Sequence, residues 1–322
     1  MKKIRWGIIG CGSIANKFVD SVAEVEDGEV VACASRTSGK AEKFAEKHHL
    51  NLFFNSYEEM LNSADIDAAY VATTHNFHYD NVMLCLEHGK AVLCEKPMAV
   101  NADQTCEMIE KARRNKLFLM EGMWTRFLPS IQQMKTWLDE GQIGELKMLR
   151  ASFAIGAAFN PAHRLFNPDL AGGALLDAGI YPISLASFVM GEQPEKLRGL
   201  ADIGETGVDE QSIYAFLYPR KRMAMLSSSV RSGSENRAEI VGTEGRIVIP
   251  AHFLGAQEVE LHRKNGEKIA LRLPYKGSAC FSFEITAAHK AMHAGQIECP
   301  VMPLDETAAI AQTMDRLQVE FA

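Results

Sequence analysis

Short apolar runs alternate with segments of helical periodicity through the first third of the chain. The apolar runs at residues 4–9, 29–34, 68–72, 91–94 and 117–120 have the length and composition of buried strands. Helical spacing of apolar residues is found between and after them, at residues 14–25, 39–48, 57–61, 78–88 and 102–115. Strands that alternate with helices form parallel sheets, so this region predicts a doubly wound α/β domain.

The pattern changes after Trp124, where β-like runs predominate. An amphipathic helix is predicted at residues 129–140 and an apolar one at 175–190, and helices at 283–294 and 306–321 end the chain. The strand-like runs are 146–155, 213–217, 224–230, 238–241, 245–249, 258–262 and 268–273. Turn sequences such as "KNGEK" separate neighbouring runs, which can therefore pair as antiparallel hairpins.

This change of pattern, together with the length of 322 residues, predicts two domains. We expect an α/β domain at residues 1–123. Residues 124–322 should form an α+β domain with a large open, mostly antiparallel sheet. The last helix, 306–321, is a candidate to pack back on the first domain.

Charge and composition exclude several classes of protein. Hydrophobic residues make up 47% of the chain, but no apolar run approaches the roughly 18 residues of a membrane span. The net charge of −7 and the lack of a long basic block argue against a nucleic-acid partner. The seven cysteines are scattered, mostly inside apolar runs, which is typical of reduced thiols in the cytoplasm. Neither Cys-x-x-Cys nor His-Glu-x-x-His occurs in the sequence, so no metal site is predicted.

The sequence "GCGSIA", residues 10–15, joins the first predicted strand to the first helix. Gly10 permits a tight turn and Gly12 lets the backbone approach a pyrophosphate. The backbone N–H groups where the helix begins, at Ser13 and Ile14, then face the anion. A plain glycine turn is the alternative, but the position between a strand and a helix favours a dinucleotide site.

The second strand ends in "CASRTSGK" rather than in the acid that grips the ribose of NAD. Ser35 and Arg36 supply a hydroxyl and a cation where a carboxylate would repel a 2′-phosphate, and Lys40 can add a second charge. This substitution predicts NADP as the cofactor, with NAD as the second choice. The alternative is that both cations are solvated surface residues.

Polar residues also follow the strand at 68–72, in the sequence "VATTHNFHYD". Thr73, Thr74 and Asn76 come at the carboxyl end of a parallel strand, where doubly wound folds bind their ligands. His78 is a further candidate for cofactor contact. It could equally be no more than the first residue of the next helix.

Glu95 and Lys96 end the strand at 91–94 abruptly and are followed by Pro97. The carboxyl end of this strand opens into the same crevice as the glycine loop. A lysine that is partly desolvated beside a cationic nicotinamide has a lowered pKa and can exchange a proton. The alternative is a lysine at a helix entry whose stem lies along apolar surface.

A third polar cluster occurs in "GGALLDAGIYPISLASFVMG", residues 172–191. Asp177 and Tyr181 are four residues apart, so on a helix both side chains project from one face. In the alternative reading, Asp177 is an acid in the first turn of the helix and Tyr181 is part of the core.

The motifs "GCGSIA", "VAT…H", "EKP" and "DAGIY" resemble, in order and approximate interval, the glucose-fructose oxidoreductase, inositol dehydrogenase and rhizopine-catabolism (Gfo/Idh/MocA) family. The segments 121–129 and 164–182 look more narrowly like its branch of dimeric dihydrodiol dehydrogenases and NADP-dependent D-xylose dehydrogenases. The resemblance implies an N-terminal Rossmann domain, a C-terminal sheet that forms a homodimer, and NAD(P)-dependent hydride transfer on a sugar, polyol or cyclic diol.

The resemblance also implies roles for particular residues. Lys96 matches the catalytic lysine of the family, Tyr181 its acid/base residue and Asp177 the supporting carboxylate. Substrate contacts are expected from Trp124, Arg126, Phe153 and Arg164, although Trp124 and Phe153 could equally be core. Two rival hypotheses are an NAD-dependent dehydrogenase of inositol type and a cofactor-sensing regulator without catalysis.

Overall fold

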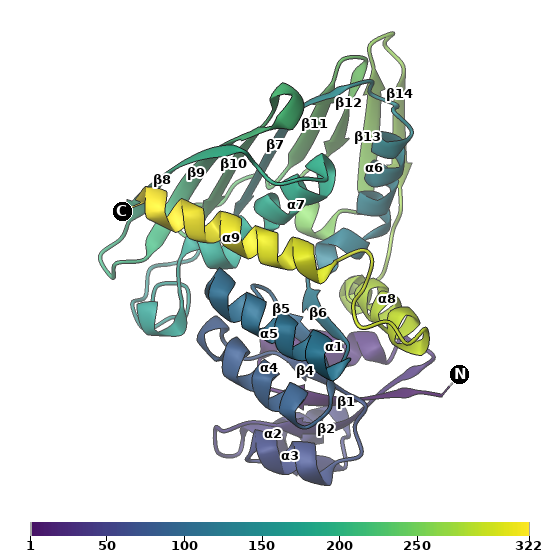
Figure 1. The fold of residues 1–322 in the computed structure, drawn as a ribbon, viewed down its shortest axis with the longest axis vertical. Coiled ribbons are helices and arrows are strands. Elements are labelled where there is room, and N and C mark those ends of the chain that lie inside the picture. The colour runs from purple at the N-terminus through teal and green to yellow at the C-terminus, as the bar shows by residue number, and fades with distance from the viewer. Residues whose placement is uncertain (1, 322) are drawn as a thin grey trace. The chain divides into compact units, whose positions relative to one another are not determined.

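Six parallel strands form the first sheet, in the order β3-β2-β1-β4-β5-β6 (Figure 1). The computed structural model describes residues 2–321. The strand order changes direction between β1 and β4, and this switch point is where doubly wound folds bind their ligands. The strands are β1 (Ile4–Ile9), β2 (Gly28–Ala34), β3 (Leu52–Phe54), β4 (Ala68–Val71), β5 (Ala91–Glu95) and β6 (Leu119–Gly122). The helices are α1 (Ser13–Val22), α2 (Lys40–His48), α3 (Tyr57–Ser63), α4 (His78–Glu87) and α5 (Ala102–Asn115).

Eight strands form the second sheet, in the order β14-β13-β12-β11-β7-β10-β9-β8. All neighbours are antiparallel except β7 and β10, which run parallel. The strands are β7 (Leu146–Ala154), β8 (Lys196–Ile203), β9 (Asp209–Tyr218), β10 (Arg222–Ser229), β11 (Ala238–Gly242), β12 (Gly245–Ile249), β13 (Glu258–Arg263) and β14 (Lys268–Arg272). Helix α6 (Pro129–Asp139) and helix α7 (Ile180–Met190), the latter preceded by a π-helical turn at Leu175–Gly179, belong to the same part of the chain. The predicted fold class is confirmed.

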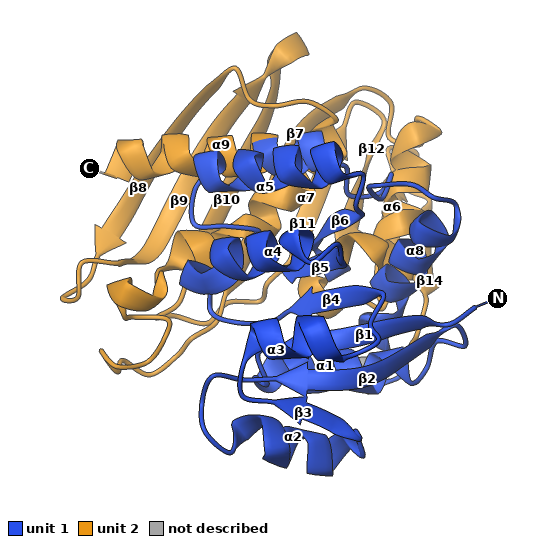
Figure 2. Cartoon of the chain, turned by 60° about the horizontal axis from the view of Figure 1, so that its bottom comes forward, with its two compact units in different colours: residues 1–124, 276–308 blue, residues 125–275, 309–322 orange. Residues whose placement is uncertain are grey.

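The chain divides into two compact units (Figure 2). The first comprises residues 1–124 and 276–308, and the second residues 125–275 and 309–322. The predicted split after residue 123 differs from this division, because helix α8 (Ser282–His293) belongs to the first unit and most of α9 (Leu304–Phe321) to the second. His289 of α8 accepts a hydrogen bond from the Trp6 indole at 2.9 Å and contacts Asp27 at 2.8 Å. Contacts between residues so far apart in the chain leave no local pattern in the sequence, so the place of α8 could not be predicted.

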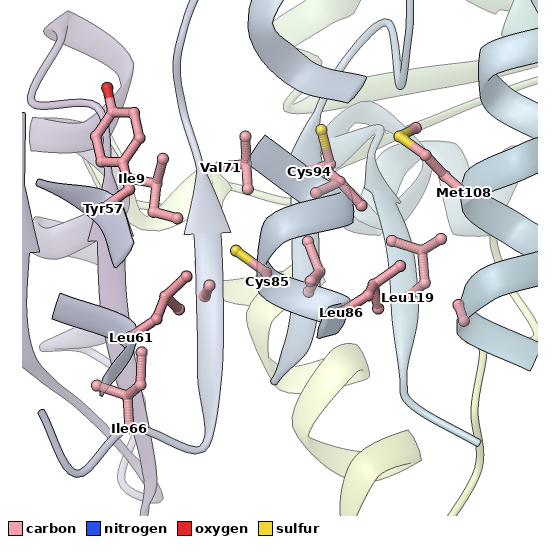
Figure 3. Close-up of a cluster of buried hydrophobic side chains, with 14 of the residues drawn as sticks. Ile9, Tyr57, Leu61, Ile66, Val71, Cys85, Leu86, Cys94, Met108 and Leu119 are labelled. Carbon is pink, nitrogen blue, oxygen red and sulfur yellow. The ribbon is translucent and has the colours of Figure 1, made fainter. Parts of the chain in front are cut away.

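One hydrophobic cluster of the first unit gathers side chains from several strands of its sheet (Figure 3). Ile9, Val71, Cys94 and Leu119 come from four different strands and lie among apolar side chains of the helices. Burying such side chains stabilises the fold by about 25 cal/mol per Å² of apolar surface. All seven cysteines lie in the described part of the chain and are free.

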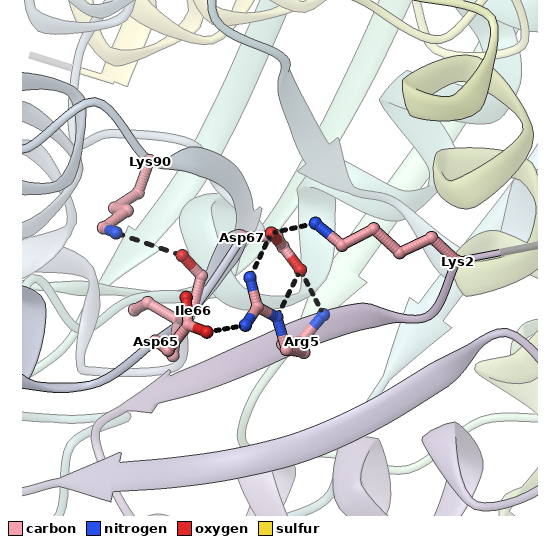
Figure 4. A network of polar contacts seen from close by, with 6 residues as sticks. All are labelled: Lys2, Arg5, Asp65, Ile66, Asp67 and Lys90. Carbon is pink, nitrogen blue, oxygen red and sulfur yellow. Dashed lines mark hydrogen bonds and ion pairs between the residues drawn. The ribbon is translucent and has the colours of Figure 1, made fainter.

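Charged groups hold the amino ends of β1 and β4 together (Figure 4). Arg5 donates to both carboxylate oxygens of Asp67 at 2.9 Å, and Lys90 donates to the Ile66 carbonyl at 3.0 Å. The pKa of Asp67 is lowered to about 2, chiefly by its hydrogen bond from Arg5. This end of the sheet is held by paired and partly exposed charges.

One segment, Pro168–Met190, is long and apolar enough to cross a membrane by length and composition. Its most apolar stretch of 18 residues has a mean hydropathy of 1.4, and 94% of that stretch is buried inside the protein. The segment is therefore a core element of the second unit. The prediction that no apolar run approaches the length of a membrane span was wrong for this segment.

Candidate active site

The glycine loop after β1 forms a close-packed turn at the carboxyl end of the sheet. Gly10 has a φ of +93°, and a Cβ added there would lie 3.0 Å from the backbone of Ala72. Gly12 is the N-cap of α1, where Ser13 is exposed and Ile14 is half-buried. The first turn of α1 thus presents its backbone N–H groups beside a cradle that no larger residue fits, which suits a pyrophosphate.

The end of β2 places Arg36 between two aromatic rings. Its guanidinium carbon lies 5.1 Å from the centre of the Tyr57 ring and 4.8 Å from that of Phe77. Ser35 is buried and accepts a hydrogen bond from the Thr37 backbone at 3.2 Å, and Lys40 is exposed at the start of α2. Arg36 is exposed, and its cation–π contacts with the two rings favour this position of the guanidinium, which lowers the entropy lost when its fork binds an anion. Sequence reasoning missed both rings, which come from other segments.

The loop after β4 has its own hydrogen bonds. Thr74 Oγ1 donates to Asn76 Oδ1 at 2.8 Å, and Asn81 Nδ2 donates to Thr73 Oγ1 at 3.1 Å. Thr73, Thr74 and Asn76 are half-buried, as expected of residues lining a site.

His78 differs from its neighbours, because its side chain is fully buried. Its Nδ1 lies 2.8 Å from the Pro97 carbonyl oxygen and its Nε2 lies 3.1 Å from that of Thr73. Burial lowers the pKa of His78 to about 4 and outweighs the hydrogen bonds to the Pro97 and Thr73 carbonyls, which raise it, while the charge of Lys96 adds a smaller lowering. This geometry favours a supporting role for His78 over the predicted contact with a cofactor.

Lys96 leaves the end of β5 half-buried, in a turn that contains a cis bond to Pro97. The preceding residue, Glu95, is buried and accepts a hydrogen bond from the Tyr70 hydroxyl of β4. The residue just before Lys96 is therefore fixed by a hydrogen bond between its side chain and the neighbouring strand.

Glu121 holds the other side of this turn. Its Oε1 accepts a hydrogen bond from the Met98 backbone at 2.9 Å, and it lies beside Cys94 in the register of β5 and β6. The sequence analysis missed Glu121. An indication was present, because Glu121 follows the apolar run 117–120 just as Glu95 follows 91–94.

Glu284 of α8 is a further buried acid that the sequence did not indicate. It is fully buried, and both carboxylate oxygens lack a hydrogen-bond partner among the described residues. Burial, and then the charge of Glu95, raises the pKa of Glu284 well above its usual range. Burial and the same charge raise the pKa of Tyr70. Burial and the charge of Glu95 therefore both favour the protonated, neutral form of Glu284.

The second unit holds the Asp177 carboxylate in a fork. Arg164 donates to its two oxygens at 2.9 and 3.2 Å, and Asp177 itself is buried. The π-helical turn that carries Asp177 begins at Leu175, whose N–H donates to Asp209 at 2.7 Å. Burial raises the pKa of Asp209 to about 6. Arg164 thus positions Asp177 through a bidentate pair, a contact that sequence reasoning did not assign to it.

The remaining predicted residues have different surroundings. Tyr181 is buried and its ring meets that of Phe153 edge-on at 5.3 Å, in the second unit. Trp124 is half-buried and stacks on Phe281 at 5.2 Å, in the first unit. Arg126 is only 2% exposed, and Ser184 accepts two hydrogen bonds from its guanidinium, both at 3.0 Å. This burial favours a structural role for Arg126 over the predicted contact with substrate.

Comparison with known proteins settles the family. Residues 4–123 match an oxidoreductase family with an NAD-binding Rossmann fold, and residues 131–248 match the GFO/IDH/MocA C-terminal domain. The trans-1,2-dihydrobenzene-1,2-diol dehydrogenase of Xenopus tropicalis is 36% identical over 321 residues, which cover 97% of this chain and 96% of that protein. The chain belongs to the Gfo/Idh/MocA family. It is an NAD(P)-dependent oxidoreductase, as predicted.

A further relative and two solved structures are also similar to this chain. The Homo sapiens trans-1,2-dihydrobenzene-1,2-diol dehydrogenase is 34% identical over 322 residues, covering 98% of this chain and 96% of that one. A 3-ketoreductase from Actinomadura kijaniata, crystallised with NADP and TDP-benzene, aligns with a TM-score of 0.90 at 27% identity, covering 99% and 98% of the two chains. An aldose-aldose oxidoreductase from Caulobacter crescentus shares the fold at 21% identity, with a TM-score of 0.90 and a coverage of 99% and 97%.

Proposed function

We propose that the protein catalyses NADP-dependent hydride transfer on a hydroxyl or carbonyl carbon of a sugar, polyol or cyclic diol, with Lys96 in proton transfer. The observation that carries this proposal is the placement of Lys96. It lies at the carboxyl end of β5, on the sheet edge where the glycine loop and the loop after β4 also lie. Its backbone is held on one side by Tyr70 through Glu95 and on the other by Glu121 through Met98.

The choice of NADP rests on Arg36, whose guanidinium is held between two rings at the end of β2. A guanidinium there can bond a 2′-phosphate, which the carboxylate typical of NAD sites would repel. The related 3-ketoreductase, at 27% identity, was crystallised with NADP.

The bound nicotinamide supplies the hydride chemistry, and the protein supplies positioning and proton transfer. In the oxidative direction the proposed roles of Tyr181 and Lys96 are both in removing the hydroxyl proton. Asp177, which Arg164 holds, is the proposed supporting carboxylate. Trp124 and Phe153 remain proposed substrate contacts.

A substrate screen tests the proposal. Relatives are named for trans-1,2-dihydrobenzene-1,2-diol, so this diol, D-xylose and inositol are each supplied with NADP⁺ and with NAD⁺. We expect the absorbance of reduced nicotinamide to rise with NADP⁺ and the diol or the aldose. Turnover of inositol with NAD⁺ alone would favour the inositol-type rival. Tight cofactor binding with no turnover of any compound would favour the regulator.

We also propose a two-fold homodimer formed by the outer face of the second sheet. Leu200 and Ile213, which pair across β8 and β9, are 69% and 56% exposed, and Met225 of β10 is 58% exposed. A contiguous exposed apolar surface of this kind marks an interface, and homo-oligomers are most often two-fold dimers. Ile213→Lys should convert the dimer to a monomer in light scattering at micromolar concentration. Phe53→Lys, at a 44% exposed position on β3 of the first unit, is the control. A monomeric wild type would contradict the proposal.

The free cysteines support a further proposal, that the protein functions in the cytoplasm, where thiols stay reduced. Cell fractionation of the untagged protein tests it.

A further inference from the structure

His78 joins three segments at the carboxyl edge of the first sheet. It is the first residue of α4, and its ring reaches the Pro97 carbonyl in the Lys96 turn and the Thr73 carbonyl after β4. Thr73 also closes over the glycine loop, since its Cγ2 would lie 2.9 Å from a Cβ at Gly10. A single buried side chain therefore contacts both the turn that carries Lys96 and the loop that packs on the phosphate cradle.

The neutral ring of His78 has one N–H proton but faces two carbonyl acceptors. A neutral imidazole donates one hydrogen bond, whereas a carbonyl oxygen can only accept. Donation to both Pro97 and Thr73 needs the imidazolium form, which burial and the charge of Lys96 disfavour, as the lowered pKa of His78 indicates. At neutral pH only one of the two carbonyls accepts a hydrogen bond from the ring.

The distances indicate which carbonyl that is. Nδ1 lies 2.8 Å from the Pro97 oxygen, and Nε2 lies 3.1 Å from the Thr73 oxygen. Both distances lie in the range of N–H···O hydrogen bonds, and we infer that the ring proton is on the nitrogen of the shorter contact. Thr73 has a second attachment, because Asn81 donates to its hydroxyl at 3.1 Å. We therefore place the single N–H of the ring on Nδ1, where it donates to the Pro97 carbonyl of the Lys96 turn.

We propose that His78 is a positioning residue for Lys96, and that its Nδ1–H donates to the Pro97 carbonyl and fixes the turn from which the lysine side chain extends. The proposal rests on the proposed role of Lys96. Together with the bond from Met98 to Glu121, it holds the backbone immediately after Lys96 by one donor and one acceptor. A displacement of about 1 Å at a reacting group costs up to about 10²-fold in rate, so loss of this bond should appear in kcat.

Two variants separate the two ring nitrogens. The amide nitrogen of Asn is attached at Cγ, as Nδ1 is, whereas that of Gln lies one bond further out, as Nε2 does. His78→Asn keeps a donor for Pro97, and His78→Gln keeps one for Thr73. We expect His78→Asn to stay within about threefold of wild-type kcat and His78→Gln to lose about 10–100-fold, with the Kd for NADPH changed by less than about threefold in both.

The matched control is His88→Gln. His88 ends the same helix, and its Nδ1 also lies 2.8 Å from a main-chain carbonyl, that of Leu84. It should keep wild-type kcat. Equal losses in His78→Asn and His78→Gln, or a His78→Gln enzyme with wild-type kcat, would overturn the proposal.

A measurement on the wild type keeps the proposal testable if the variants fail to fold. Two-bond ¹H–¹⁵N correlation spectra of ¹⁵N-histidine-labelled protein distinguish the tautomers. We expect His78 to carry its proton on Nδ1 at pH 7, and protonation on Nε2 or on both nitrogens would contradict the proposal. Lys96→Met, assayed alongside, distinguishes failure of the proposed function from failure of the role proposed for His78. An active Lys96→Met enzyme refutes the proposed function, whereas an inactive one beside an active His78→Gln refutes only the role of His78.

Discussion

The two ends of the first sheet hold their polar groups in opposite ways. At the amino end, Arg5 and Asp67 form a bidentate ion pair in partial contact with solvent (Figure 4). At the carboxyl end, His78 and Glu95 are buried and bond to main-chain carbonyl or tyrosine groups, and Glu284 is buried, with no hydrogen-bond partner for its carboxylate oxygens in the described part of the chain.

This difference separates groups that serve stability from groups that serve chemistry. Partly exposed ion pairs cost little to form and contribute modestly to stability. Buried titratable groups lower stability unless they are paired, and clusters of them are typical of functional sites. We therefore expect changes at the carboxyl end to alter activity, or even to raise stability, and changes at the amino end to alter stability alone.

The largest effect should come from Lys96→Met. A positioned acid/base group contributes roughly 10²–10⁴ in rate, so kcat should fall by that factor while NADPH binding and Tm stay near wild type. Lys90→Met is the matched control at the amino end, where Lys90 bonds the Ile66 carbonyl, and it should keep full activity. Steady-state kinetics and thermal melts measure both. A Lys96→Met enzyme with a third or more of wild-type kcat would contradict the role of Lys96 in proton transfer.

Glu284→Gln should stabilise the protein, with a pH dependence of defined sign. Because the folded-state pKa of Glu284 is raised, its protonated form stabilises the fold fully below the unfolded pKa of about 4.5, and this stability is lost as pH rises. Gln cannot ionise in either state. The variant should exceed wild type by about 1–3 kcal/mol in unfolding free energy at pH 8, with no difference near pH 4. Urea titrations at the two pH values test this, and a constant difference at both would show that ionisation is not the cause.

Arg36→Asp should weaken NADP(H) binding by about tenfold or more, because the fork that binds the 2′-phosphate is replaced by a like charge. Titration of NADPH and NADH against wild type and variant checks the prediction. NADH serves as the internal control, since it lacks the phosphate and its affinity should not fall. Tighter binding of NADH than of NADPH by the wild type would reverse the assignment.

The smallest effect should come from Asp67→Asn. We expect a loss of about 1 kcal/mol in unfolding free energy at pH 7, since solvent screens this pair, and no change in kcat. The pKa of Asp67 is lowered to about 2, so its contribution is present above the unfolded pKa of about 3.9 and disappears as pH falls through the folded value. The gap between variant and wild type should therefore close between pH 4 and pH 2. A loss of kcat would show that the amino end also serves the chemistry.

Sequence patterns predicted most of the fold because they report local burial. Alternation of apolar runs with helical spacing located five of the six strands of the first sheet, and missed only β3, whose side chains are largely exposed. In the second sheet the edge strand β8 was missed, since charged side chains and a glycine alternate with its few apolar residues. The motifs "GCGSIA" and "EKP" predicted the glycine loop and the Lys96 turn because backbone constraints of this kind need particular residues.

The sequence by itself determined most of the strands and helices along the chain, the glycine cradle and the position of Lys96 after β5, because each depends on neighbours within a few residues. Only the tertiary structure decided that His78 bonds Pro97, that Glu121 holds Met98, that Arg164 grips Asp177 and that α8 brings Glu284 into the first unit. These contacts join segments that are distant in the chain. Their strength depends on burial and on the direction of a donor toward an acceptor, and neither quantity leaves a periodic trace in the sequence.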